Sequence, residues 1–210
     1  MSNDSEPAEA SVLVPASPRM QQLGESVIAG ERGIEIRNVA DLTLFAKTAF
    51  ASGLCPEAFQ SAQDVFLAVE MGLELGLRPG QALRLLYVVH GRVGLETDAM
   101  LGIVRATGLL ERMRESIEGL GPAGEVTEQT RAICRTWRRG EPEPTEYVYS
   151  VADARAAGLY PGAKGSAWQA YPKRLLQHRA RGFCLRDGWA DVLAGIQTRE
   201  EIEEVAAQEP

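Results

Sequence analysis

Apolar residues recur at helical spacing in two early segments of the chain. Residues 42–53 (LTLFAKTAFASG) follow Asn38 and Asp41, either of which is a suitable helix cap, and they end on a glycine. Residues 56–76 (PEAFQSAQDVFLAVEMGLELG) carry aromatic and aliphatic side chains every three or four positions, with a proline near the first turn and Gly76 where a helix would stop. The pattern therefore predicts two amphipathic helices before the first strands.

The pattern then changes to that of strands. In residues 83–96 (LRLLYVVHGRVGLE), two short β-branched and apolar runs flank a His-Gly pair at 90–91, which predicts a β-hairpin. Asp98, or the threonine before it, is positioned to cap a helix over residues 98–108 (DAMLGIVRATG), which ends on a glycine. A hairpin followed by a helix is therefore expected in this part of the chain.

Three later segments alternate at period two. They are RMRESIEG (112–119), RAICRTWRRG (131–140) and TEYVYS (145–150), and turn-rich stretches connect them. They predict an antiparallel meander, but each face of 131–140 mixes polar and apolar residues, so the pattern leaves open which face is core. Ser150 then caps a predicted helix over 150–159 (SVADARAAGL). The expected fold class is α+β: a small antiparallel sheet, made of the hairpin and the meander, packed against several helices.

The order of these segments indicates one folded core between two acidic ends. Residues 1–35 mix Ser, Pro, Glu and Gly without a sustained period, which predicts a flexible acidic segment. Residues 36–197 are the predicted α+β core, and residues 198–210 an acidic C-terminal helix or tail. No run approaches the roughly 18 apolar residues that a membrane span needs, and the first residues are acidic where a signal peptide would be basic. We therefore expect a cytoplasmic protein.

Cysteine and histidine usage indicates no metal site. The three cysteines, Cys55, Cys134 and Cys184, are an odd number without CxxC spacing, and the chain has two histidines, His90 and His178. Such a set forms no recognisable zinc site, so the cysteines are expected to be reduced core thiols. Neither histidine has a serine or cysteine partner nearby in sequence, so a surface or packing role is expected for both.

Charge is distributed unevenly along the chain. The net charge is −7, but residues 71–190 hold 17 Lys and Arg against 13 Asp and Glu, a net charge of +4. Residues 155–186 contain seven of these cations and no acid. A basic body with acidic ends is typical of proteins that meet a polyanion, while a solvated surface of mixed sign is the plainer interpretation.

The acid-free interval contains the pattern of a helix from Pro172 to Asp187. One sector of this helix is apolar and predicted to be buried, comprising Leu176, Ala180, Phe183 and Cys184. The cations lie on both sides of that sector, and no i to i+4 ion pair within the helix can neutralise them. Two interpretations stay open: neighbouring elements donate carboxylates to a packing helix, or the helix contacts phosphates, with Trp168 and Tyr171 available to stack on bases.

Enzymatic chemistry has weak support in the sequence. There is no GxxxxGK[ST] phosphate loop, so nucleotide-driven work is not expected. Asp187 and Asp191 could belong to a metal-dependent nuclease, but their spacing suits helix-end capping equally well and further clustered carboxylates are missing. No catalytic residue, metal ligand or required cofactor is therefore predicted, and Mg²⁺ would act only as a counterion of DNA.

Two ordered runs of residues resemble a known family. Residues 167–183 (AWQAYPKRLLQHRARGF), followed by 189–202 (WADVLAGIQTREEI), carry a Trp, a Tyr-Pro step, a Lys-Arg pair and an Arg-Ala step, then Asp-Val before a glycine and an acidic helix. Upstream, residues 73–108 contain a Gly-Leu-rich helix end, a hairpin and a following helix in the same order. Over about residues 56–205, the chain resembles the RecT-like branch (RecT/Redβ superfamily) of phage single-strand annealing proteins.

The resemblance implies an ATP-independent recombinase that coats single-stranded DNA, promotes pairing with a complementary strand, and assembles into rings or helical filaments. It implies a phage or prophage protein of the bacterial cytoplasm, with a phage exonuclease or a host single-strand-binding protein as further partners. The expected DNA-binding residues are Lys173, Arg174, Arg179 and Arg181 first, then Arg92 and Arg105, with Arg186, Lys164, Trp168 and Tyr171 completing the set. The alternatives left open are a non-catalytic scaffold protein that binds an acidic partner and, with less support, the metal-dependent nuclease.

Overall fold

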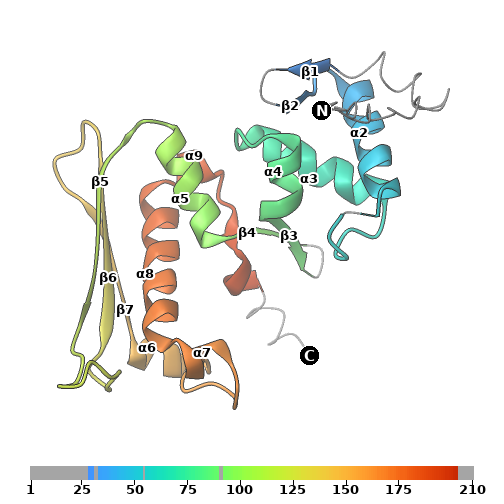
Figure 1. Cartoon of the computed structure of the whole chain (residues 1–210). Coiled ribbons are helices and arrows are strands. Elements are labelled where there is room, and N and C mark those ends of the chain that lie inside the picture. The colour runs from blue at the N-terminus through green and yellow to red at the C-terminus, as the bar shows by residue number, and fades with distance from the viewer. Residues whose placement is uncertain (1–27, 31–32, 54, 90–91, 203–210) are drawn as a thin grey trace, which may run out of the picture.

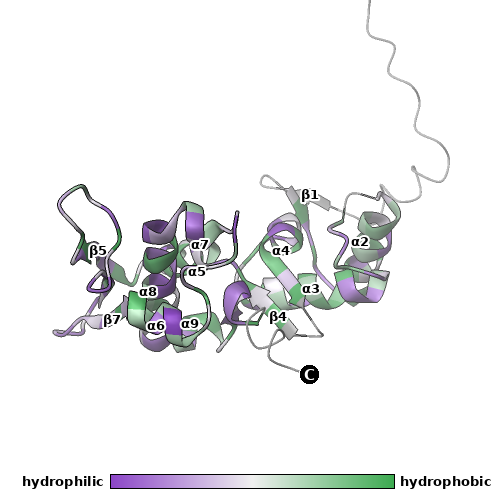
Figure 2. Ribbon diagram, turned by 90° about the horizontal axis from the view of Figure 1, so that it is seen from below, coloured by the Kyte–Doolittle hydropathy of each residue, from purple (hydrophilic) through white to green (hydrophobic). Residues whose placement is uncertain are grey.

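The computed structural model describes residues 28–30, 33–53, 55–89 and 92–202, and it has the predicted α+β fold class (Figure 1). The hairpin and the meander form two separate sheets, not the single sheet that the sequence predicted. A helical part lies at one end of the molecule and a three-stranded meander at the other, with a second small sheet between them (Figures 1 and 2). None of the described helices is long and apolar enough to cross a membrane.

The helical part contains the hairpin strands β1 (Ile28–Gly30) and β2 (Gly33–Glu35) and the helices α2 (Val39–Ala51), α3 (Ala62–Glu74) and α4 (Pro79–Leu85). Side-chain caps fix two helix starts, since Asn38 accepts a hydrogen bond from the backbone N–H of Asp41, and Ser61 from that of Asp64. The second helix therefore begins later than the predicted start near residue 56. The β1–β2 hairpin lies inside the segment predicted to be flexible, so regular structure begins before residue 36.

Small residues let α3 and α4 pack closely. A Cβ atom at Gly72 would lie 2.3 Å from the Cβ of Ala82, so glycine is required at this crossing. The sequence pattern missed α4, which is only seven residues long. Pro79 stands in its first turn, and the Gln81 side chain accepts from the backbone N–H of Arg78 at 3.0 Å.

The predicted hairpin is confirmed by β3 (Leu86–Val89) and β4 (Arg92–Leu95), which pair antiparallel. Its expected turn at 90–91 lies outside the described residues. A third strand, β8 (Gln197–Thr198), adds parallel to β4. Thr198 is 4% exposed and Ile202 1% exposed, so the packed core continues past residue 197, where the sequence placed its end.

The predicted meander is confirmed by three antiparallel strands, β5 (Leu110–Glu118), β6 (Arg131–Arg138) and β7 (Thr145–Ser150). The helices around it are α5 (Thr97–Ala106), α6 (Val151–Ala156), α7 (Ala167–Ala170), α8 (Pro172–Gly188) and α9 (Ala190–Leu193). Ser150 caps α6 as predicted. The N-cap of α5 is Glu96, so Asp98 does not cap that helix and is available for other contacts. α8 lies along one face of the meander, and no described helix covers the other face (Figure 1).

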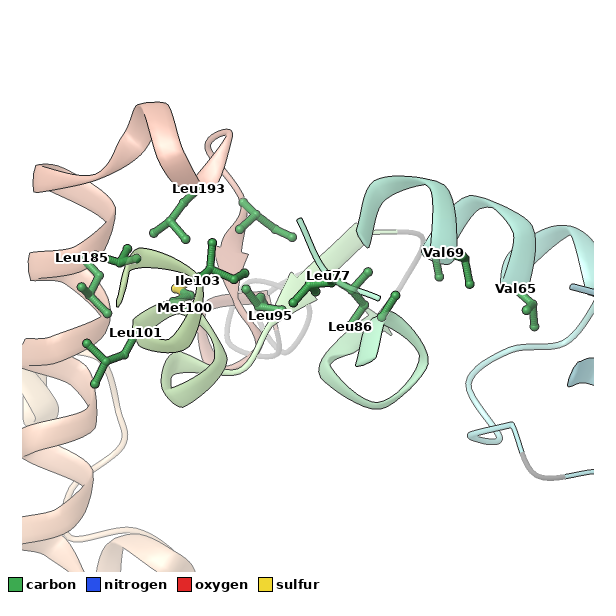
Figure 3. Close-up of a cluster of buried hydrophobic side chains, with 14 of the residues drawn as sticks. Val65, Val69, Leu77, Leu86, Leu95, Met100, Leu101, Ile103, Leu185 and Leu193 are labelled. Carbon is green, nitrogen blue, oxygen red and sulfur yellow. The ribbon is translucent and has the colours of Figure 1, made fainter. Parts of the chain in front are cut away.

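The buried apolar residues form two clusters that meet at α8. The first runs from Val65 and Val69 on α3 through the central sheet to Leu185 and Leu193 on α8 and α9 (Figure 3). The second lies between α8 and the meander and contains the predicted stripe residues Leu176, Ala180 and Cys184, with Phe183 packed against it. The apolar sector of the helix is therefore confirmed. Because α8 joins both clusters, most of its surface is needed for packing.

Candidate nucleic-acid interface

Arg181, a first choice for DNA contact, is buried on α8 with 7% of the residue exposed. Its Nε and Nη2 atoms donate to the two carboxylate oxygens of Glu115 on β5 at 3.0 and 2.9 Å, and its Nη1 atom donates to Asp98 on α5. Burial alone would lower the pKa of Arg181, but the hydrogen bonds to Glu115 and the charges of Glu115 and Asp98 raise it above its ordinary value. Of the two interpretations left open by the sequence, the one in which neighbouring elements donate carboxylates is correct for Arg181, so the expected DNA contact through this residue is not supported.

Arg179 and Arg186 are also engaged by the fold. Arg179 is 8% exposed and has partners among neighbouring groups. Arg186 donates to Glu201, which also accepts hydrogen bonds from the backbone and hydroxyl of Thr198 at 2.9 Å each. This ion pair fastens α8 to the segment after β8. The expected phosphate contacts through these two arginines are therefore replaced by packing contacts, and the packing interpretation is correct for this part of the helix.

The start of α8 is different, because its cations reach solvent. Tyr171, Lys173 and Arg174 are exposed there, and Lys164 is exposed in the turn before α7; we call these four residues the α7–α8 patch. Tyr171 is 68% exposed, which is unusual for an aromatic side chain. The first turn of α8 contains no acid, and its backbone N–H groups add a positive dipole at the same end.

Few carboxylates oppose this patch. The Nη2 atom of Arg174 lies 3.5 Å from Asp98, and both side chains are 55% exposed, so this ion pair is weak in water. Asp98 is already bound by Arg181. Lys173 donates to the backbone carbonyl of Gly124 at 3.2 Å, and neither it nor Lys164 forms an ion pair with any described residue. The patch therefore keeps a positive charge that the described fold does not cancel.

The remaining predicted residues lie elsewhere. Trp168 is half-buried and lines a small pocket of about 50 Å³ with His178 and Glu200, so only part of its side chain is accessible for the expected base stacking. Arg105 is exposed in the last turn of α5, seven residues and roughly 10 Å of helix beyond Asp98, so it does not join the patch. Arg92 begins β4, and its side chain lies outside the described residues.

A second cationic surface, which the sequence analysis did not select, lies on the outer face of the meander. Glu115 and Cys134 point toward α8, so the alternate residues Arg114 and Arg135, which pair across β5 and β6, point away from it. Arg112 lies opposite Trp137, with its guanidinium carbon 3.9 Å from the ring centroid. The period-two alternation of the sequence already placed the two arginines of β5 on one face of that strand, and Arg135 and Trp137 on one face of β6, but it did not show whether those faces were buried or exposed.

The alternative of a metal-dependent nuclease gains no support from the placement of its two aspartates. Arg138 donates to both carboxylate oxygens of Asp191, at 2.9 and 2.5 Å, and this hydrogen bonding lowers the pKa of Asp191 to about 2. Asp187 is exposed. Among the described residues there is no group of three or more His, Cys, Asp or Glu side chains that could hold a metal ion.

No protein-family model matches the chain, and no curated protein matches its sequence. The resemblance to RecT-like proteins therefore stays an expectation based on the quoted residues. The Tyr-Pro-Lys-Arg run of that resemblance, residues 171–174, coincides with the exposed start of α8, whereas its Arg-Ala step falls in the buried part.

Proposed function

We propose that the protein binds single-stranded DNA and promotes annealing of complementary strands without nucleotide hydrolysis. The observation that carries this proposal is the α7–α8 patch, in which Lys173, Arg174 and an exposed tyrosine lie at the start of α8 without a balancing set of carboxylates, and Lys164 is exposed shortly before them in the chain. The same residues include the run that most resembles the RecT-like proteins. The alternative of a scaffold protein with an acidic partner uses the same charges, so an experiment must separate the two.

The proposed mechanism uses charge and stacking, and it forms no covalent bond. Lys164, Lys173 and Arg174 would neutralise phosphates and release counterions. Tyr171 would stack on an unpaired base, a contact typically worth about 1–3 kcal/mol. Base edges that face away from the protein would then pair with a second strand. Because one patch makes few contacts, useful affinity would require many subunits on one strand, and this fits the expected assembly into rings or filaments.

The salt dependence of DNA binding tests this proposal. The double variant Lys173→Gln/Arg174→Gln removes two phosphate contacts, so the slope of log K against log salt should become shallower by about 1.4, at 0.7 per contact for single strands. Fluorescence anisotropy with a labelled oligothymidylate measures the slope. The control variant Lys47→Gln/Arg84→Gln removes the same charge from exposed positions on α2 and α4 and should keep the wild-type slope.

Two outcomes would count against the proposal. If the folded Lys173/Arg174 variant keeps the wild-type slope, the patch does not contact phosphates. If the wild-type protein binds an acidic protein that random oligonucleotides fail to displace, the scaffold alternative is favoured. Incubation of labelled single strands with Mg²⁺ or Mn²⁺ tests the nuclease alternative directly, because cleavage would appear as shortened strands.

A further inference from the structure

The outer face of the meander is a surface whose composition is unexplained by packing. The strand registers place the outward side chains in rows across the sheet: Arg112 and Trp137, then Arg114, Arg135 and Glu146, then Ser116, Ile133 and Val148, then Glu118 and Arg131. α8 covers the opposite face, and no described helix lies on this one (Figure 1). Ile133 in the third of these rows is 5% exposed, so the long side chains around it cover it, whereas Arg112 is exposed against the partly buried Trp137.

The charges on this face are unequal. Arg131 pairs with Glu118 at 2.7 Å, and Arg135 pairs with Glu146. Arg112 and Arg114 are both exposed, and neither forms an ion pair with any described residue. They are alternate residues of one strand, so their Cα atoms are about 6.8 Å apart. That spacing is comparable to the distance between successive phosphates of an extended single strand.

A further cation continues the row at one end. Arg139 is exposed just after β6, and its backbone N–H donates to the carbonyl of Leu109 at 2.8 Å. This bond continues the strand pairing beyond Arg112 and Trp137. Arg114 and Arg139 therefore flank the arginine-tryptophan contact on its two sides, and a polyanion laid along the strands would meet a cation in each position.

The contact between Arg112 and Trp137 is suited to an unpaired base. The guanidinium lies 3.9 Å from the ring centroid, so one of its faces is covered by the indole while the residue stays exposed. Bases stack on arginine planes as well as on aromatic rings in single-strand recognition. The indole holds the guanidinium in place before binding, so less side-chain conformational entropy is lost when a base binds.

We propose that the outer face of the β5–β6–β7 sheet is a second binding surface for single-stranded nucleic acid. An unpaired base stacks on the Arg112 guanidinium, and phosphates contact Arg114 and Arg139. The inference rests on the proposed function and adds a surface to it. The sheet separates this surface from α8, so one subunit can hold two strands on different sides. A second copy of the chain is disfavoured as the occupant, because a symmetric contact would bring the unpaired arginines of two copies together.

The test compares the double variants Arg112→Gln/Arg114→Gln and Lys173→Gln/Arg174→Gln with a control variant. Each is titrated against a labelled oligothymidylate, and binding is measured by fluorescence anisotropy. Arg112→Gln/Arg114→Gln should lower affinity about five-fold or more, which is the lower end of the contribution of one stacked base. Its salt slope should become shallower by about 0.7, because Arg114 is the one proposed phosphate contact that this variant removes. Circular dichroism verifies folding, and Lys47→Gln/Arg84→Gln controls for the charge change.

The outcomes separate the two proposals. If the Arg112/Arg114 variant binds like wild type while the Lys173/Arg174 variant loses affinity, the outer-face surface is refuted and the proposed function stands. If the Arg112/Arg114 variant alone loses affinity, the outer face is supported and the α7–α8 patch is refuted. If the Arg112/Arg114 variant changes the sedimentation of the protein but not its DNA binding, the face contacts another copy and the inference fails. If wild-type protein binds no single strand, both proposals fail.

Discussion

Arg181 gives the sharpest test of how the basic helix is used. Replacing it by methionine keeps the length of the stem but removes the guanidinium, which leaves Glu115 without its bidentate partner. The Glu115 side chain is 22% exposed, so its charge would be largely desolvated, whereas Asp98 is 55% exposed and regains water. Loss of one partner from a buried ion pair lowers the free energy of unfolding by about 3–5 kcal/mol. Because Asp98 is exposed and regains water, we expect Arg181→Met to lie near the lower value, about 3 kcal/mol.

Urea unfolding followed by far-ultraviolet circular dichroism measures this loss. For a chain of this size, 3 kcal/mol corresponds to a drop of about 6–12 °C in Tm. The double variant Arg181→Met/Glu115→Gln should recover part of the stability, because it removes the unpaired carboxylate. As a matched control, Arg155→Met breaks the exposed ion pair with Glu128 and should change stability little.

The reasoning would be refuted by a stable Arg181→Met protein. If its free energy of unfolding stays within about 0.5 kcal/mol of wild type, as for ordinary surface substitutions, the ion pairs with Glu115 and Asp98 do not hold the fold together. A stable variant that also loses affinity for single strands would restore Arg181 as a DNA contact. The expected result is lower stability and, at temperatures where the variant is folded, unchanged DNA affinity.

Three further predictions follow from packing and protonation. Gly72→Ala should destabilise the protein by about 1–3 kcal/mol in urea unfolding, because the new methyl group meets Ala82. Burial, and then the charge of the nearby Arg174, lower the pKa of His178 below its ordinary value of 6.5. The unfolded chain therefore protonates this imidazole more readily than the folded protein does, and the free energy of unfolding should fall as the pH drops through 6.5. His178→Gln should reduce that pH dependence. Ellman's reagent should titrate at most one thiol, Cys55, in the native protein and three in urea, because the other two cysteines are buried.

The sequence predicted the parts of the fold that depend on local pattern. The alternation in 112–119, 131–140 and 145–150 predicted the meander, and the apolar sector of residues 172–187 predicted the buried side of α8. Caps with polar side chains, as at Ser150, were also readable. Short elements escaped prediction, because α4 and β8 are too brief to establish a period and depend on neighbours that are distant in sequence.

The site was predicted less well, because its chemistry depends on long-range contacts. The absence of acids from residues 155–186 pointed to carboxylates from other elements, and those that bind Arg181 come from positions 66 and 83 residues earlier in the chain. Only the fold brings Glu115 and Asp98 to α8. The sequence could identify residues 171–174 as candidates for DNA contact, and they are exposed at the start of α8. It could not predict where along the helix the exposed cations end and the buried ones begin.

Strand annealing without ATP tests the central claim most directly. Two complementary oligonucleotides labelled as an energy-transfer pair report duplex formation, and the wild-type protein should accelerate it above the spontaneous rate when no nucleotide is present. The Lys173→Gln/Arg174→Gln variant should return the rate toward the spontaneous value, and the Lys47→Gln/Arg84→Gln control should anneal like wild type. Annealing at the spontaneous rate by folded wild-type protein, at concentrations that cover the strands, would contradict the account.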